Sequence, residues 1–174
     1  MYLRCDLNIN GGRKNLLIVP RHDETVEHSA LKLACAILFW ERELILDATV
    51  NHPALSNCPF VPDMMALDDS GAISFWGECG NTSLNKLDKV IKKVPGARIV
   101  VLRESPDDAR QMRTALSGQT KKHQRVEILA WPKPEFERWL AAVQDSNSVV
   151  GESTGRSMSL VFNEQVFDVD FESF

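Results

Sequence analysis

Apolar and polar residues alternate near both ends of the chain, as expected for β-strands that bury one face. The first segment, with a glycine pair at its centre, predicts a hairpin over residues 2–19. A second alternating segment predicts a terminal hairpin over 157–171. The residues between 145 and 156 are polar, and we expect them to form a linker.

Apolar positions with helical spacing predict helices between these hairpins. The first is expected to begin at Asp23, acting as N-cap, and to end near Arg42, with Glu27 on the face that docks against a sheet. The remaining helices are expected over 83–94, 106–116 and 134–144, and strands over 44–48, 60–67, 72–79, 97–102 and 126–131. Residues 24–102 therefore run helix, three strands, helix, strand. We expect one α/β domain over 1–174.

The composition is that of a globular protein. The 174 residues are 44% hydrophobic and 25% charged, which is enough for a packed core. No segment approaches the roughly 18 uncharged apolar residues of a membrane span, and the N-terminal segment lacks the apolar stretch of a signal peptide. We therefore expect a cytoplasmic protein with no membrane partner. The four cysteines form no C-x-x-C pair, which argues against zinc and against a disulfide framework.

Two acids, Asp63 and Glu78, flank the hairpin predicted over 60–79. A two-residue turn at Ser70-Gly71 would set these acids directly opposite each other. Their Cβ atoms would then be about 4.5–5.5 Å apart, and two like charges in that position need a cation between them. Two other interpretations stay open: neighbouring Lys or Arg side chains neutralise the acids, or Asp63 accepts turn hydrogen bonds.

Glu27 would join these two acids if the first helix packs over the hairpin. Its alternative role is a favourable interaction with the helix N-terminus. A cluster of carboxylates suits Mg²⁺ or Mn²⁺, which prefer oxygen ligands. Lys86 and Lys89, on the following helix, could supply an ammonium group that stabilises developing negative charge. They could equally belong to an exposed lysine face.

Charge is unevenly distributed, although the net charge is −4. Residues 81–131 contain eleven Lys or Arg and five acids, whereas the segments before and after them are acidic. A basic segment beside an acidic pair is a pattern that a phosphate-handling site can use. An ordinary solvated helix face gives the same pattern.

With these acids and the lysine-rich helix in place, the chain resembles the bacterial YaeQ family. The resemblance is carried by RHDETVEHSALKLACAIL, by PDMMALDDSGAISFWGECG with its W-x-E-x-G core, by the basic helix that follows, and by the terminal hairpins. That family looks like a branch of the PD-(D/E)-x-K nuclease-like superfamily. The resemblance therefore implies a restriction-endonuclease-like core, a mixed sheet flanked by helices, with hairpins added at both ends.

The resemblance also implies roles for individual residues. Asp63 matches the P-D acid, Glu78 the E-x-K glutamate, and Glu27 the acid of the first helix. Gly80 stands where the superfamily has its lysine. Relatives with that lysine on the next helix make Lys86 or Lys89 the candidate.

Three functions remain open at this point. The first is a Mg²⁺-dependent nuclease with Asp63, Glu78 and Glu27 as metal ligands, Glu27 alternatively acting as a base through water, and Lys86 or Lys89 as charge stabiliser. The second is a nuclease-like scaffold without turnover that binds nucleic acid or protein. The third is an interaction protein whose hairpins offer edge strands to a partner or a second copy. The sequence leaves the oligomeric state undetermined.

Overall fold

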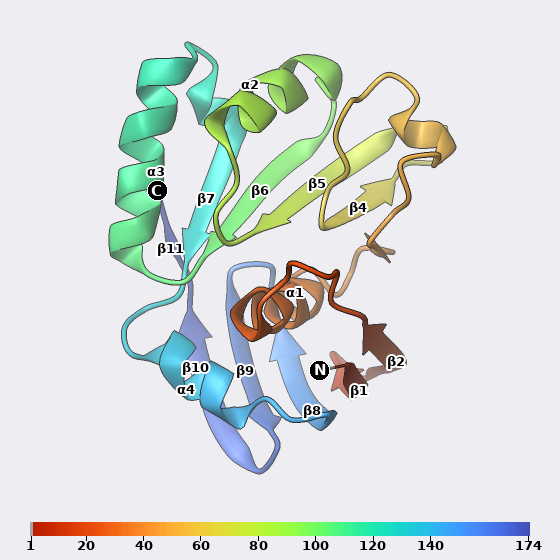
Figure 1. The fold of residues 1–174 in the computed structure, drawn as a ribbon. Coiled ribbons are helices and arrows are strands. Elements are labelled where there is room, and N and C mark those ends of the chain that lie inside the picture. Colours follow the sequence, from red (N-terminus) through yellow and green to blue (C-terminus); the bar gives the residue numbers. More distant parts are fainter. Residues whose placement is uncertain (1) are drawn as a thin grey trace. The chain divides into compact units, whose positions relative to one another are not determined.

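The computed structural model describes residues 2–174, which form two mixed β-sheets and four α-helices (Figure 1). The chain divides into two compact units. One contains the chain up to Glu41 together with Trp131–Glu172, and the other contains Arg42–Ala130 and Ser173–Phe174. That the whole chain acts as one domain stays a prediction. Within residues 2–174, none of the helices has the length and apolar character needed to cross a bilayer.

The first unit is built on a five-stranded sheet with the order β10-β9-β8-β1-β2. Its strands are β1 (Leu3–Ile9), β2 (Gly12–Ile18), β8 (Ser146–Ser153), β9 (Ser157–Phe162) and β10 (Gln165–Asp170). The two predicted hairpins are confirmed as β1-β2 and β9-β10.

The predicted linker over 145–156 is wrong, because most of it is strand β8, which pairs in parallel with β1. This strand is polar, yet its buried Asn147 donates through its side-chain amide to the carbonyl oxygens of Gln144 and Arg4. Polar side chains that satisfy their hydrogen bonds can be buried at little cost. The apolar alternation that predicts a strand is therefore absent from this segment.

Helix α1 (Val26–Leu38) is shorter than predicted at both ends. Thr25, not Asp23, is its N-cap, and the Thr25 hydroxyl accepts from the backbone N–H of His28. The helix is buried all round from Ser29 to Leu38, so its burial does not follow one face. Helix α4 (Glu135–Ala142) completes this unit and buries Trp139.

The second unit is built on a six-stranded sheet with the order β11-β7-β6-β5-β4-β3. Its strands are β3 (Ile45–Leu46), β4 (Met64–Leu67), β5 (Ile73–Cys79), β6 (Arg98–Arg103), β7 (Val126–Ala130) and β11 (Glu172–Ser173). The helices are α2 (Leu84–Lys93) and α3 (Pro106–Gln119), with short 3₁₀ turns at Pro53–Leu55 and His123–Arg125. The order α1, β3, β4, β5, α2, β6 confirms the predicted sequence of elements.

Helices α2 and α3 pack against the same face of this second sheet. Leu87 and Val90 of α2 share one apolar core with Leu116 of α3 and with alternate strand residues such as Trp76 and Val101. Glu78 is paired with Val101 in the parallel ladder between β5 and β6. Partners in a ladder point to the same side, so Glu78 faces the side covered by α2. This placement decides which lysine can reach it.

Candidate functional site

The register between β4 and β5 places the two predicted acids together. Met64 pairs with Gly77 and Met65 with Trp76, and one more step sets Asp63 opposite Glu78. The predicted register is therefore confirmed at this end of the hairpin.

The turn that produces this register differs from the prediction. Asp68 and Ala72 close a three-residue loop in which Gly71 has a φ of 80°. The three-residue loop shifts the pairing of β5 with β4 by one residue relative to a two-residue loop. A bulge in β5 shifts the pairing back, because Leu67 pairs with Ile73 whereas Ala66 pairs with Phe75. The longer turn and the bulge together therefore give the predicted register.

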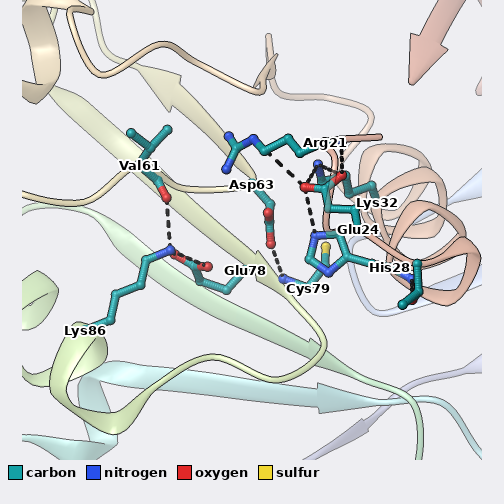
Figure 2. Close-up of polar contacts among 10 residues, drawn as sticks. Arg21, Glu24, His28, Lys32, Val61, Asp63, Glu78, Cys79 and Lys86 are labelled. Atoms are coloured by element: carbon teal, nitrogen blue, oxygen red, sulfur yellow. Dashed lines mark hydrogen bonds and ion pairs between the residues drawn. The ribbon is translucent and has the colours of Figure 1, made fainter. Parts of the chain in front are cut away.

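Glu78 is a buried carboxylate that binds an ammonium group and an indole. Lys86 Nζ lies 2.7 Å from Oε1 and 2.8 Å from Oε2 of Glu78 (Figure 2). The same ammonium donates to the carbonyl oxygen of Val61 at 2.9 Å. Trp76 Nε1 donates to Glu78 Oε1 at 2.6 Å. The fully buried Trp76 is thus part of the site.

The surroundings of Glu78 raise its pKa to about 7. Burial is the largest cause, because it disfavours the charged form. The charge of Lys86 opposes this rise, the charge of Asp63 adds to it, and the hydrogen bonds from Lys86 and Trp76 oppose it. The carboxyl group therefore changes protonation near neutral pH.

Asp63 is also buried, and it lies immediately before β4. Its Oδ2 accepts from the backbone N–H of Cys79 at 2.8 Å, which fixes the carboxylate against the end of β5. Its charge acts on Glu78. The two acids are thus neighbours by register, by hydrogen bonding to the same strand and by electrostatics.

Gly80 has a φ of 71°, in the left-handed region where L side chains are strained. Its backbone N–H donates to Leu102 O at 2.8 Å, which holds the chain in this turn as it leaves β5. The backbone conformation therefore disfavours a lysine at this position. It gives a physical reason for the glycine in W-x-E-x-G.

Helix α2 supplies the ammonium group through Lys86 and not through Lys89. Ser83 caps this helix by accepting from the Lys86 backbone N–H, so Lys86 lies in the first turn, close to the end of β5. Lys89 is exposed, and its Nζ lies 5.7 Å from the centre of the Phe60 ring. Of the two predicted lysines, the structure brings Lys86 to Glu78.

Glu27 belongs to the first unit and is exposed in the first turn of α1. Hydrogen bonds from its own backbone N–H and from the Thr25 side chain lower the pKa of this carboxyl. This is the helix N-terminal interaction given above as its alternative role. Its expected position on a docked helix face is wrong, and its role as a metal ligand or base stays a prediction.

Comparison with known proteins gives no match to a family model and no match to a curated protein sequence. Solved structures of YaeQ proteins match nearly the whole chain. The YaeQ protein of Xanthomonas axonopodis pv. citri has a TM-score of 0.77 at 14% identity, covering 99% of this chain and 96% of its own. The YaeQ protein of Pseudomonas syringae has a TM-score of 0.73 at 12% identity, and the match covers 99% of this chain and 93% of the Pseudomonas protein. The chain has the YaeQ fold.

Sharing the YaeQ fold supports the resemblance seen in the sequence motifs, and at these identities it shows the fold alone. The α/β class and the mixed sheets agree with it.

The first unit of this chain holds a second polar cluster that the sequence analysis missed. The ammonium of Lys32 is fully buried and lies 2.7 and 2.9 Å from the two Glu24 carboxylate oxygens (Figure 2). His28 Nε2 lies 3.6 Å from Glu24 Oε1, and the backbone N–H of Arg21 donates to Oε2. A lysine inside the apolar run LKLACAIL was the available signal, because a charge is rarely buried without a partner.

Proposed function

We propose that the second unit carries a divalent-metal-dependent phosphodiesterase site that acts on nucleic acid. Asp63 and Glu78 are the proposed ligands of Mg²⁺ or Mn²⁺, and Lys86 is the proposed charge stabiliser. The observation that supports this most is the Lys86–Glu78 contact, made beside Asp63. It unites two acids and one lysine, the set that the nuclease resemblance implies, with the lysine supplied by the following helix.

The donor atoms suit such an ion. Carboxylate oxygens are what Mg²⁺ and Mn²⁺ prefer, and Asp63 and Glu78 both offer them. Glu78 must be deprotonated to bind a metal, and its pKa of about 7 makes this pH-dependent. A bound ion would add to the positive charge that Lys86 already provides and would favour the ionised form of Glu78. Glu27 stays a proposed further ligand or base.

Each side chain of the site has a separate proposed role. A metal ion held by Asp63 and Glu78 would supply polarisation of the phosphate and a lowered pKa of a bound water. The Lys86 side chain is 19% exposed, and its ammonium group, held by Glu78 and Val61 O, is the proposed contact to a phosphate oxygen. The Cys79 N–H fixes one oxygen of Asp63 and thus orients the other. Trp76 holds Glu78 in place through the hydrogen bond from its indole N–H to Oε1.

Matched variants on α2 test this function. Wild type, Asp63→Asn, Lys86→Ala and Lys89→Ala are titrated with Mn²⁺ while the unfolding temperature is followed, and each is assayed on single-stranded, double-stranded and structured nucleic acids. We expect Mn²⁺ to stabilise wild type and Lys89→Ala but not Asp63→Asn. We expect Lys86→Ala to lose about 100-fold or more in cleavage rate, as loss of one charge-stabilising donor typically does. Equal cleavage by the two lysine variants would refute the assignment.

A second candidate is a scaffold that binds nucleic acid or protein without turnover. It is favoured by one observation: both oxygens of Glu78 already accept from protein donors, as in a structural ion pair. Binding without cleavage, in the presence of Mn²⁺, would select this candidate. A steep loss of affinity with salt would indicate a nucleic-acid partner, because phosphate contacts release counterions.

A further inference from the structure

A basic hollow lies at the C-terminal end of α2, whereas Lys86 lies in the first turn of that helix. The hollow has a volume of about 430 Å³, which is within the usual range of small-molecule sites. All the residues that line it belong to the second unit. They are Ile91 of α2, Pro95 after that helix, and four residues that follow α3: Lys121, Lys122, Gln124 and Arg125.

Three of the lining residues are cations: Lys121, Lys122 and Arg125. Within residues 2–174, none of the three lies within 4.0 Å of a carboxylate oxygen. The lining that the structure describes contains no acid either. Because like charges repel each other, three cations around one hollow favour an anion between them.

Arg125 is held in place by neutral groups. Its guanidinium donates to Pro95 O at 2.6 Å and to Ala97 O at 3.0 Å, which ties the 3₁₀ turn to the segment after α2. These carbonyl oxygens fix the side chain without cancelling its charge. A cation that is already ordered loses less conformational entropy when a ligand binds.

Asp88 separates the hollow from the Lys86 side of α2, and its own charge is already balanced. The Lys92 ammonium lies 2.6 Å from the Asp88 carboxylate, and the Thr120 side chain also hydrogen-bonds to it. The Lys86 ammonium is held by Glu78. The hollow is therefore a second basic site, separate from the Asp63–Glu78–Lys86 site.

We propose that this hollow binds a diphosphate group, either as inorganic pyrophosphate or as part of a nucleoside diphosphate. Lysine and arginine are the residues that bind phosphate in proteins. A single phosphoryl group carries about 1.5–2 negative charges near pH 7, so it leaves part of the charge of three cations uncompensated. Two linked phosphates compensate that charge more fully. Ile91 and Pro95 give the hollow an apolar wall that a sugar or base can contact.

Double variants of the full chain test the proposal by isothermal titration calorimetry. The hollow variant is Lys121→Gln/Lys122→Gln, and Lys121→Arg/Lys122→Arg keeps both charges. The control is Arg13→Gln/Arg110→Gln, which removes the same charge from cations that each have a carboxylate partner. The probes are pyrophosphate, ADP, adenosine and inorganic phosphate. EDTA is present, so that no divalent ion can hold an anion at the Asp63–Glu78–Lys86 site, and salt is varied.

We expect wild type, the control and the arginine variant to bind both diphosphates with a Kd of roughly 1 mM or below. The hollow variant should bind them about tenfold more weakly or less tightly still, because it loses two charged donors. Affinity should fall as salt rises, because these charges are exposed to solvent. Tighter binding of ADP than of pyrophosphate assigns the site to a nucleotide, and equal binding assigns it to the diphosphate group alone.

Several results would overturn the proposal. They are the absence of saturable binding by wild type, equal affinity of wild type and the hollow variant, and binding of adenosine or inorganic phosphate as tight as that of ADP. Loss of binding in Lys86→Ala but not in the hollow variant would place the anion at the other site and would overturn it as well. None of these results depends on cleavage, so the proposed nuclease function stands or fails separately.

Discussion

The raised pKa of Glu78 has a measurable effect on stability. In the unfolded chain this carboxyl has an ordinary pKa of 4.5, and in the folded protein the pKa is about 7. Between these values the folded state binds more protons than the unfolded state, so the free energy of unfolding falls as pH rises through this window. The difference corresponds to about 3 kcal/mol at pH values above both pKa values, since one pKa unit is worth about 1.4 kcal/mol.

Glu78→Gln removes this titration while keeping an oxygen that can accept from Trp76. Urea unfolding of wild type and variant is compared from pH 4.5 to 8.5. We expect wild type to lose about 3 kcal/mol relative to the variant across this range. Direct titration of the Glu78 carboxyl by NMR should give a midpoint near 7. Asp63→Asn should lower that midpoint, because the charge of Asp63 raises it.

The control is Asp68→Asn, in the turn of the same hairpin. Hydrogen bonds from the Ser70 side chain and the Ala72 backbone lower the pKa of Asp68, so it titrates below the range examined. Its stability difference from wild type should be flat between pH 5 and 8.5. Two results would refute the burial argument. One is a titration midpoint of Glu78 below about 5. The other is a difference in unfolding free energy between wild type and Glu78→Gln that does not change with pH.

Three further predictions concern Gly80 and Trp76 in the framework of the site and Lys32 in the first unit. Gly80→Ala should lower the free energy of unfolding in urea by about 1–2 kcal/mol, because φ is 71° at this position. Gly80→Asn should lower it less. Equal losses for the two variants would contradict the backbone explanation. Trp76→Phe should raise the pKa of Glu78 in NMR titration, since the indole bond lowers it. Lys32→Met should lower the free energy of unfolding by about 3–5 kcal/mol, because the Glu24 carboxylate loses its buried partner. Adding Glu24→Leu should recover most of this loss in thermal or urea unfolding. A double variant that is no more stable than Lys32→Met would contradict this.

Much of the second unit follows from the sequence pattern. Strands β4 to β7 are visible as short apolar runs and helix α2 as an amphipathic pattern, and the element order from α1 to β6 follows from them. The proximity of Asp63 and Glu78 was also predicted. It depends on register, and the register derived from a two-residue turn is the one observed where Met64 pairs with Gly77.

What could not be predicted depended on hydrogen bonds and not on periodicity. Strand β8 is polar because Asn147 satisfies its amide through buried partners. The start of α1 depended on the choice between Asp23 and Thr25 as cap, which spacing alone does not resolve. The three-residue turn and the bulge were both missed, and the predicted register held because one offsets the other. The choice of Lys86 over Lys89 required knowing which side of β5 faces α2.

The bulge in β5 sets the phase of the half-strand that ends at the site. Ser74 is the extra residue, and its hydroxyl donates to Ala66 O at 3.2 Å. If Ser74 were paired and the ladder ran on from Leu67–Ile73 without a bulge, every later side chain of the strand would turn to the opposite surface of the sheet, carrying Glu78 away from its ammonium partner without altering either group. Deleting Ser74 removes only the unpaired residue, so Phe75 should stay opposite Ala66 and Glu78 opposite Asp63.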